Sequence, residues 1–245
     1  MQIETLAVRL RPRSPLEAAD LGVRMCQVRA REIYKCCAMV CIPVTLLSLA
    51  TVSIRYWLPL LLIWWLKPWM DRTILFVLSR AAFGQSTTPL DVWRSQRAIW
   101  WHQLISTLTL RRISPWRSFT QPVYQLEGLP LLRTAGRIKQ LRRGRSGQAL
   151  LMTSAFSLAE SALAVALFSL RFWFSPPSQE TTWASLLTPD DAGLLAPLLA
   201  AVGYAGVVLF LEPFYVAAGF AMYLNRRAEL EAWDIEQEFR RAFAH

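Results

Sequence analysis

Histidine is scarce in this chain, and the motifs of common catalytic and metal sites are missing. Only two His residues occur among the 245 residues. No glycine-rich phosphate loop, His-Glu-x-x-His metal motif or nucleophile elbow is present. We therefore expect no metal and no cofactor, and we favour a non-catalytic protein. Catalysis by carboxylates and arginines alone stays open.

Cysteine is also rare and shows no metal or redox pattern. The four cysteines form no Cys-x-x-Cys pair, and no His lies near them in the sequence. We expect them to be small, buried apolar side chains on the reducing side of a membrane. They are Cys26, Cys36, Cys37 and Cys41.

Charge is sparse, and long apolar runs take its place. Charged residues make up 18% of the chain and hydrophobic residues 54%, and eleven Trp suit a membrane–water interface. The mean hydropathy is +0.28. A helix needs about 20 apolar residues to cross a bilayer. Three runs reach this length, with Glu160 as their one charge: 36–54, 149–170 and 192–211. We predict an all-α integral membrane protein.

The distribution of charge predicts on which side of the membrane each loop lies. Residues 80–150 contain twelve basic and two acidic residues, a surplus equal to the net charge of the whole chain, +10. Basic segments stay in the cytoplasm, and the acidic 175–191 loop is expected outside. With a return through 57–83, the chain has about four transmembrane helices. Both termini are then cytoplasmic, and we expect a bacterial inner-membrane protein.

The chain accordingly divides into five parts, with amphipathic helices at the membrane surface between the two pairs of spans. Residues 92–110, for example, have an apolar part that is too short to span and carry three Trp. The parts are a cytoplasmic N-terminal segment (1–35), a first transmembrane hairpin (36–83), a basic cytoplasmic and interfacial region (84–148), a second transmembrane pair (149–225) with an external loop (172–191), and a cytoplasmic amphipathic tail (226–245).

The 57–83 run allows two interpretations. Its first ten residues are apolar and span about 15 Å, half a bilayer, before Lys67, Asp71 and Arg72 interrupt it. Either the helix is long and tilted, or it returns to the interface, bends at Pro68 and continues as a flat helix. The three charged residues are either a snorkelling interfacial cluster or a buried functional cluster. Lys67 and Asp71 are four residues apart and could pair.

Two carboxylates lie within the apolar runs. Measured from the basic residues at the cytoplasmic ends of their helices, Glu160 and Glu212 both lie about 21–23 Å along, so they have similar depth. Ionisable groups in hydrocarbon face a bundle interior, pair, or line a polar path. Ser157 and Ser161 add polarity near Glu160, and Pro213 predicts a bend beside Glu212. The pair forms either a proton or cation site or a structural contact between protonated carboxyls.

Charged residues on the cytoplasmic side are candidates for contacts with anionic lipid head groups or with partner proteins. No aromatic platform accompanies the bases, so we expect no nucleic-acid binding. The acidic tail either docks on the basic region of its own chain or offers its apolar face to a partner. The candidates are Arg133, Arg137, Lys139, Arg142, Arg143, Arg145, Glu229, Glu231, Asp234 and Glu236.

Four stretches resemble an uncharacterised family of proteobacterial inner-membrane proteins. They are "EPFYVAAGFAMYLNRRAELEAWDIEQEFRR" (212–241), "LRPRSPLEAADLG" (10–22), "WLKPWMDR" (65–72) and "SRAAFGQ" (79–85). Members typically occur beside genes for a MoxR-type AAA+ ATPase and for von Willebrand-type or transglutaminase-linked membrane proteins. The Pro-bent last span with a Tyr-x-x-Arg-Arg-x-Glu tail is also similar to the membrane domain of some glycerophosphodiester phosphodiesterases. The resemblance implies a role in assembling or maintaining an envelope complex.

From these features we expect a non-catalytic inner-membrane subunit or scaffold of an envelope-associated complex. It would bind a MoxR-type ATPase, other envelope proteins or anionic lipid through its cytoplasmic face. The alternative is a small transporter or channel that uses Glu160 and Glu212. A homo-oligomer is compatible with both.

Overall fold

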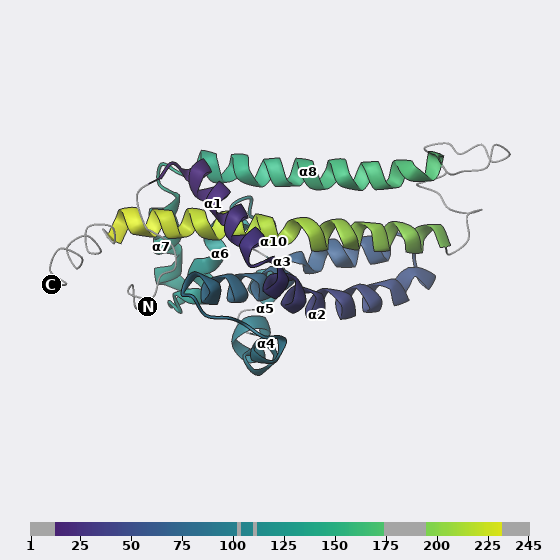
Figure 1. Cartoon of the computed structure of the whole chain (residues 1–245), viewed down its shortest axis with the longest axis horizontal. Helices are drawn as coiled ribbons and strands as arrows, with labels where there is room; N and C mark the ends of the chain where they lie inside the picture. Colours follow the sequence, from purple (N-terminus) through teal and green to yellow (C-terminus); the bar gives the residue numbers. More distant parts are fainter. Residues whose placement is uncertain (1–12, 102–103, 110–111, 174–194, 232–245) are drawn as a thin grey trace.

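The computed structural model describes residues 13–101, 104–109, 112–173 and 195–231, and within these ranges every regular element is a helix (Figure 1). The elements are α1 (Pro15–Val28), α2 (Ala30–Leu49), η2 (Ala50–Ser53), α3 (Leu58–Ala82), α4 (Pro89–Arg94), η3 (Arg97–Trp101), α5 (Leu104–Leu108), α6 (Arg117–Leu126), α7 (Leu131–Arg142), α8 (Ser146–Trp173) and α10 (Leu195–Glu231).

Three helical segments are long and apolar enough to cross a membrane. They are Ala30–Ser53, which combines α2 and η2, then Ser146–Leu170 in α8, and Leu195–Glu231 in α10. Their positions match the three apolar runs of the sequence. The all-helical character is therefore confirmed for the described residues, and three helices have the length and composition needed to span a membrane. The helix α3 lies beside them, but its charged residues set it apart from the three.

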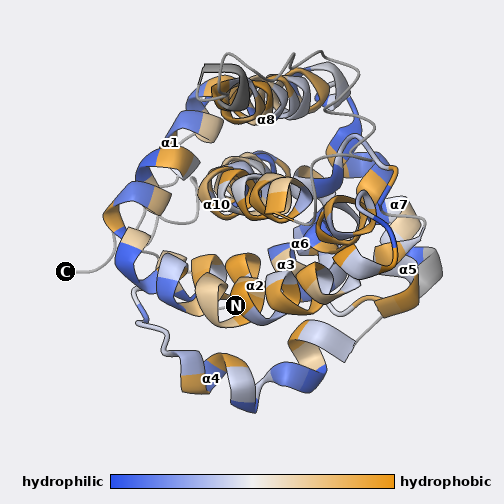
Figure 2. Ribbon diagram, turned by 90° about the vertical axis from the view of Figure 1, so that its right-hand side faces the viewer, coloured by the Kyte–Doolittle hydropathy of each residue, from blue (hydrophilic) through white to orange (hydrophobic). Residues whose placement is uncertain are grey.

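The helix α10 is the centre of the molecule. Seen along the bundle, it is surrounded by α1, α2, α3, α6 and α8 (Figure 2). Its second half is almost continuously buried from Glu212 to Asn225, whereas much of its first half is exposed or half-buried. Small residues make this close packing feasible, because Ala217, Ala218 and Gly219 let neighbouring backbones approach.

The N-terminal part contains a helix that packs on α10. Ser14 and Glu17 form a reciprocal cap at the start of α1, and Pro15 occupies its first turn. Gly22 faces the carbonyl of Ala217 so closely that a Cβ would overlap it. The 1–35 segment therefore includes an integral element of the bundle, and α2 already begins at Ala30.

The helix α3 runs without interruption from Leu58 to Ala82, with Pro68 inside it. This continuous helix agrees with the first interpretation of the 57–83 run, in which one long helix carries the charges. Lys67, Asp71 and Arg72 are 5%, 0% and 3% exposed, so they are buried in the bundle and do not snorkel.

The region between α3 and α8 consists of short helices. Instead of one surface helix over 92–110, the chain forms α4, a π-helical turn and α5. At the other end, α10 continues through position 225 to Glu231, so the tail begins as part of the same helix. The 172–191 loop from position 174 onward and the rest of the tail lie outside the described residues.

Gly219 tests the close packing of α6 on α10. A Cβ at this position would overlap both the backbone and the side chain of Ser118. We expect Gly219→Ala to lower the free energy of unfolding by about 1–3 kcal/mol, since the crowding forces a backbone shift. Thermal denaturation of the purified protein in detergent measures this. Gly206→Ala is the control on the same helix, where a Cβ meets nothing within 4 Å; equal stability of the two variants would contradict the packing.

Candidate functional site: a buried charge network

Lys67 connects the two carboxylates that the sequence places in different apolar runs. Its Nζ lies 2.6 Å from Oε2 of Glu160 on α8 and 2.8 Å from Oε2 of Glu212 on α10. The Lys67 side chain is 6% exposed and that of Glu212 is 5% exposed, whereas Glu160 retains 20%. One ammonium group on α3 therefore holds α8 and α10 together.

Arg117 makes a second bridge from the first residue of α6. Its Nη2 lies 2.5 Å from Oε1 of Glu212, and its Nε lies 3.0 Å from Oδ2 of Asp71 on α3. Burial alone would lower the pKa of the Arg117 guanidinium, but its neighbours, Asp71 foremost, raise it above its usual value. Arg117 therefore stays charged.

Tyr204 completes the arrangement from α10. Its hydroxyl donates a hydrogen bond of 2.8 Å to Oε1 of Glu160. The six side chains form what we call the charge network: Lys67, Asp71, Arg117, Glu160, Tyr204 and Glu212.

Two further arginines flank the charge network. Arg72 donates from Nη1 to the hydroxyl of Thr107 at 3.0 Å and from Nη2 to the carbonyl of Ala98 at 3.3 Å. The guanidinium of Arg112 lies 3.6 Å from the centroid of the Trp64 ring, a cation–π contact.

Asp71 is the least satisfied member of the network. It is fully buried, and no N–H or hydroxyl group of the described residues donates a hydrogen bond to its carboxylate oxygens. Its contact with Arg117 is an ion pair by distance without hydrogen-bond alignment. Buried carboxylates are normally matched by several donors, so Asp71 depends on Arg117 for its compensation.

The sequence identified most, but not all, of this site. It singled out Lys67, Asp71, Glu160 and Glu212, and the structure brings them together. Lys67 and Asp71 pair with other helices instead of with each other.

Other predicted or functional residues fall differently. Arg72 points to α5 and η3, and Ser157 and Ser161 are exposed on α8, away from the network. Arg117 and Tyr204 were missed. Arg117 is one of twelve basic residues in the 80–150 region, and Tyr204 is a single Tyr in an apolar run, so nothing in the sequence distinguishes either as a site residue.

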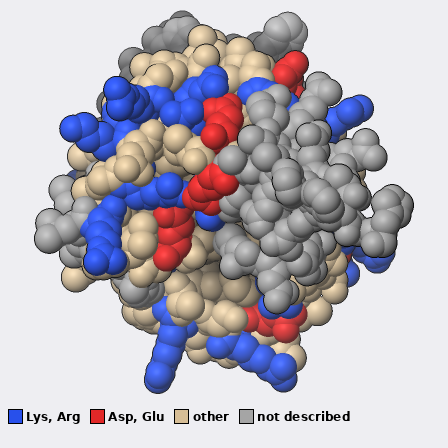
Figure 3. All heavy atoms as spheres, turned by 90° about the vertical axis from the view of Figure 1, so that its left-hand side faces the viewer, with Lys and Arg blue, Asp and Glu red and all other residues tan. Residues whose placement is uncertain are grey.

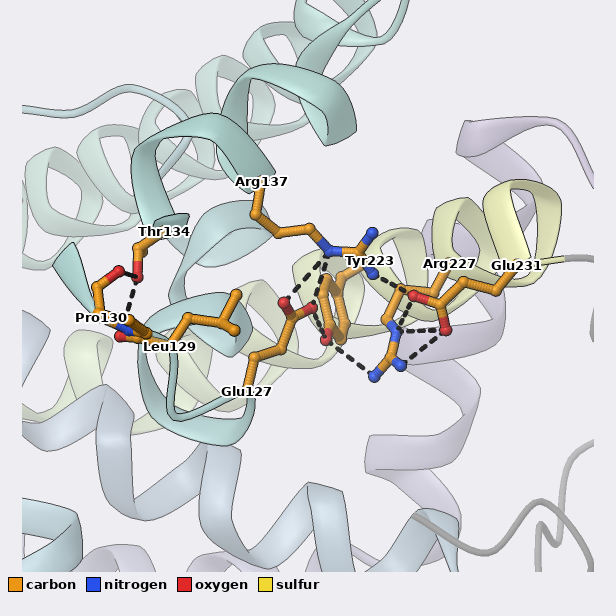
Figure 4. Close-up of polar contacts among 8 residues, drawn as sticks. All are labelled: Glu127, Leu129, Pro130, Thr134, Arg137, Tyr223, Arg227 and Glu231. Atoms are coloured by element: carbon orange, nitrogen blue, oxygen red, sulfur yellow. Dashed lines mark hydrogen bonds and ion pairs between the residues drawn. The ribbon is translucent and has the colours of Figure 1, made fainter. Parts of the chain in front are cut away.

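A second ionic cluster joins the end of α10 to the basic region (Figure 4). Arg137 on α7 pairs with Glu127 at 3.2 Å and also with Glu231. Tyr223 donates to Glu127 at 2.7 Å, and Arg227 pairs with Glu231 at 2.7 Å. The beginning of the tail is thus docked on its own chain.

The remaining candidates for lipid or partner contact divide into engaged and exposed residues. Arg145 pairs with Glu229 at 2.9 Å. The Arg142 guanidinium stacks 3.4 Å from the centroid of the Trp116 ring. Asp234 and Glu236 lie outside the described residues. The exposed bases are Arg133, Lys139 and Arg143.

The cysteines are buried free thiols, and Sγ of Cys37 lies 3.3 Å from Sγ of Cys41. Burial raises the pKa of the Cys26 thiol to about 12, so it is not a nucleophile at neutral pH. Among the described residues, no group of three or more His, Cys, Asp or Glu side chains could hold a metal ion.

Removing Arg117 tests whether the charge network holds the helices together. We expect Arg117→Met to lower the free energy of unfolding by about 3–5 kcal/mol, because it strips Asp71 and Glu212 of a buried counter-charge. Chemical denaturation in mixed micelles, followed by Trp fluorescence, measures this.

Arg133→Met is the matched control, since Arg133 is exposed on α7; its effect should stay within about 0.5 kcal/mol. Adding Asp71→Asn to Arg117→Met should recover part of the loss. If Arg117→Met is as stable as Arg133→Met, the ion pairs do not determine the packing.

Relatives give no further guide to this site. Comparisons with protein-family models, with curated proteins and with solved structures found no match to this chain.

Proposed function

We propose that the protein is a non-catalytic subunit of a bacterial inner-membrane complex, which presents a fixed cytoplasmic platform to partner proteins. The observation that carries this proposal is the position of Arg117. It belongs to α6, in the basic region assigned to the cytoplasmic side, yet its guanidinium pairs inside the bundle with α3 and α10.

The contacts at both ends of the short helices support a rigid platform. Arg117 attaches the start of α6 to the membrane helices, and Arg137 attaches α7 to the end of α10. Tyr223 of α10 also bonds to Glu127, just after α6. A scaffold needs such a fixed surface, because partners that bind a preorganised face lose less entropy.

The surface of this platform is basic. Lys and Arg side chains gather around the end of the molecule where α7 and the end of α10 lie, and a group of acidic side chains lies between them (Figure 3). Since Glu229 and Glu231 are already paired within the chain, the available contact residues are mainly bases. An acidic partner surface or anionic lipid fits this face best.

The platform is tested by removing its exposed bases. We expect the triple variant Arg133→Gln, Lys139→Gln and Arg143→Gln to recover about tenfold less partner protein than the wild type after light cross-linking in native cells. The reason is that the charge attraction between this face and its partner is removed. Quantitative mass spectrometry of the nanodisc-purified protein measures the recovery.

The matched control removes three exposed bases from α1 and α2 by Arg24→Gln, Arg31→Gln and Lys35→Gln. It lowers the net charge equally but should leave recovery unchanged. Equal losses in both variants would mean that overall charge matters and not the platform; no recovered partner in the wild type would reject the scaffold.

A small transporter is the second candidate, favoured by the shared ammonium of Lys67. Protonation of either Glu160 or Glu212 would release Lys67 to the other, so the three groups can exchange partners within two predicted spans. Such exchange of ion pairs is a way to couple proton binding to movement of α8 against α10.

Flux measurements separate this candidate from the scaffold. If the protein transports, Glu160→Gln should abolish a pH-dependent ion flux in liposomes by removing one protonation site. Asp20→Asn is the control, because Asp20 is exposed on α1. Circular dichroism confirms that both variants are folded. Absence of flux in the wild type, or unchanged flux in Glu160→Gln, would reject transport through this site.

A further inference from the structure

A polar pocket adjoins the charge network. Its volume is about 360 Å³, which is within the range of small-molecule sites. Its walls come from α3, α5, α6, α7 and the turn before α6. It therefore lies where the membrane bundle meets the short helices, and Arg117 belongs to both the network and the pocket wall.

The wall chemistry favours an anion. None of the twelve described lining residues is acidic, and two carry guanidinium groups, Arg72 and Arg117. Both arginines are buried, at 3% and 9% exposure. Most of the other lining residues bear hydroxyl or amide groups. A wall of hydrogen-bond donors and positive charge suits phosphate oxygens and repels cations.

Arg117 has donor capacity left for a ligand. It uses Nε and Nη2 in its ion pairs with Asp71 and Glu212. Its Nη1 forms no ion pair or hydrogen bond with the residues that the structure describes. A bound anion could therefore reach this nitrogen without breaking the charge network.

Two amide side chains on the wall have polar atoms without a hydrogen-bond partner among the described residues. The Nε2 and Oε1 atoms of Gln121 are buried and bond to none of the described residues. Gln125 donates from Nε2 to the carbonyl of Arg72 at 2.8 Å, while its Oε1 has no donor within the described ranges. Buried polar groups are nearly always matched by protein, water or ligand. These amides can supply a ligand with both a donor and acceptors after a change of side-chain rotamer.

We propose that this pocket binds a phosphate monoester. Arg72 and Arg117 face the phosphate, and the amides of Gln121 and Gln125 serve the hydroxyl groups of the esterified alcohol. The phosphate monoester is common to a soluble sugar or glycerol phosphate, whose alcohol carries free hydroxyl groups, and to the head group of phosphatidic acid, whose glycerol offers acyl ester oxygens to the amides instead. The site is independent of the proposed scaffold function, because none of the three bases tested for partner binding lines the pocket.

Binding is measured on the full chain in phosphatidylcholine nanodiscs. Glycerol 3-phosphate tests the soluble source, with glycerol as its unphosphorylated control. Nanodiscs that contain phosphatidic acid test the lipid source, with diacylglycerol as the control. One phosphate probe should raise the unfolding temperature in a saturable way, and its unphosphorylated control should not. If neither phosphate probe does so, the proposal is rejected.

Gln121→Leu distinguishes a ligand contact from a structural role. It keeps the side-chain volume and removes an unmatched amide, so the ligand-free protein should be at least as stable as the wild type, while affinity for the phosphate probe falls about tenfold. Gln140→Leu is the control, because Gln140 is exposed on α7 and does not line the pocket.

Unchanged affinity in Gln121→Leu would overturn the assignment, and so would an equal loss in Gln140→Leu. Should Gln121→Leu fail to fold, Ser114→Ala replaces it, since Ser114 lines the pocket from the turn before α6. About a threefold loss of affinity is then expected, and wild-type affinity would again overturn the proposal. The triple variant of Arg133, Lys139 and Arg143 should recover less partner but bind the phosphate probe as well as the wild type does. The two proposals can therefore fail independently.

Discussion

The guanidinium of Arg117 is the contact on which the arrangement of this molecule depends. It neutralises one carboxylate on α3 and another on α10, and it brings the first turn of α6 into the bundle. Two packed helices without ionic contacts could slide or rotate against each other, because hydrophobic attraction has no preferred direction. A charged side chain held between two acids fixes both the distance and the register of the helices around it.

Buried ion pairs rarely add much net stability, because the cost of desolvation offsets the attraction between the charges. Their value here is specificity, and α8 shows this most clearly. Almost none of the apolar stretch of α8 is buried in the chain, so packing alone positions it weakly. Glu160 supplies its polar link to Lys67 and Tyr204. Lipid chains offer Glu160 no polar partner, so its pairing with α3 and α10 is selective.

The sequence predicted the long helices well, but it predicted the side-chain contacts of the charge network only in part. Apolar runs announce α2, α8 and α10, because length and composition alone decide whether a helix can span. The acids in those runs pointed to the site. Arg117 could not be found this way, since its role depends on a tertiary contact between residues 95 positions apart. The short helices from α4 to α5 likewise follow from packing against α2 and α3, which no local periodicity reveals.

The unbroken length of α10 has a mechanical consequence. Its 37 residues make a rod of about 55 Å, whereas the hydrocarbon core of a bilayer is about 30 Å thick. A helix of this length is longer than one span needs, and α1, α6 and α7 pack against it. A change in the tilt of α10 therefore displaces the helices that pack around its end, because the displacement grows with distance along the helix. The tilt angle of α10 therefore links the thickness of the surrounding bilayer to the position of the helices packed around its end.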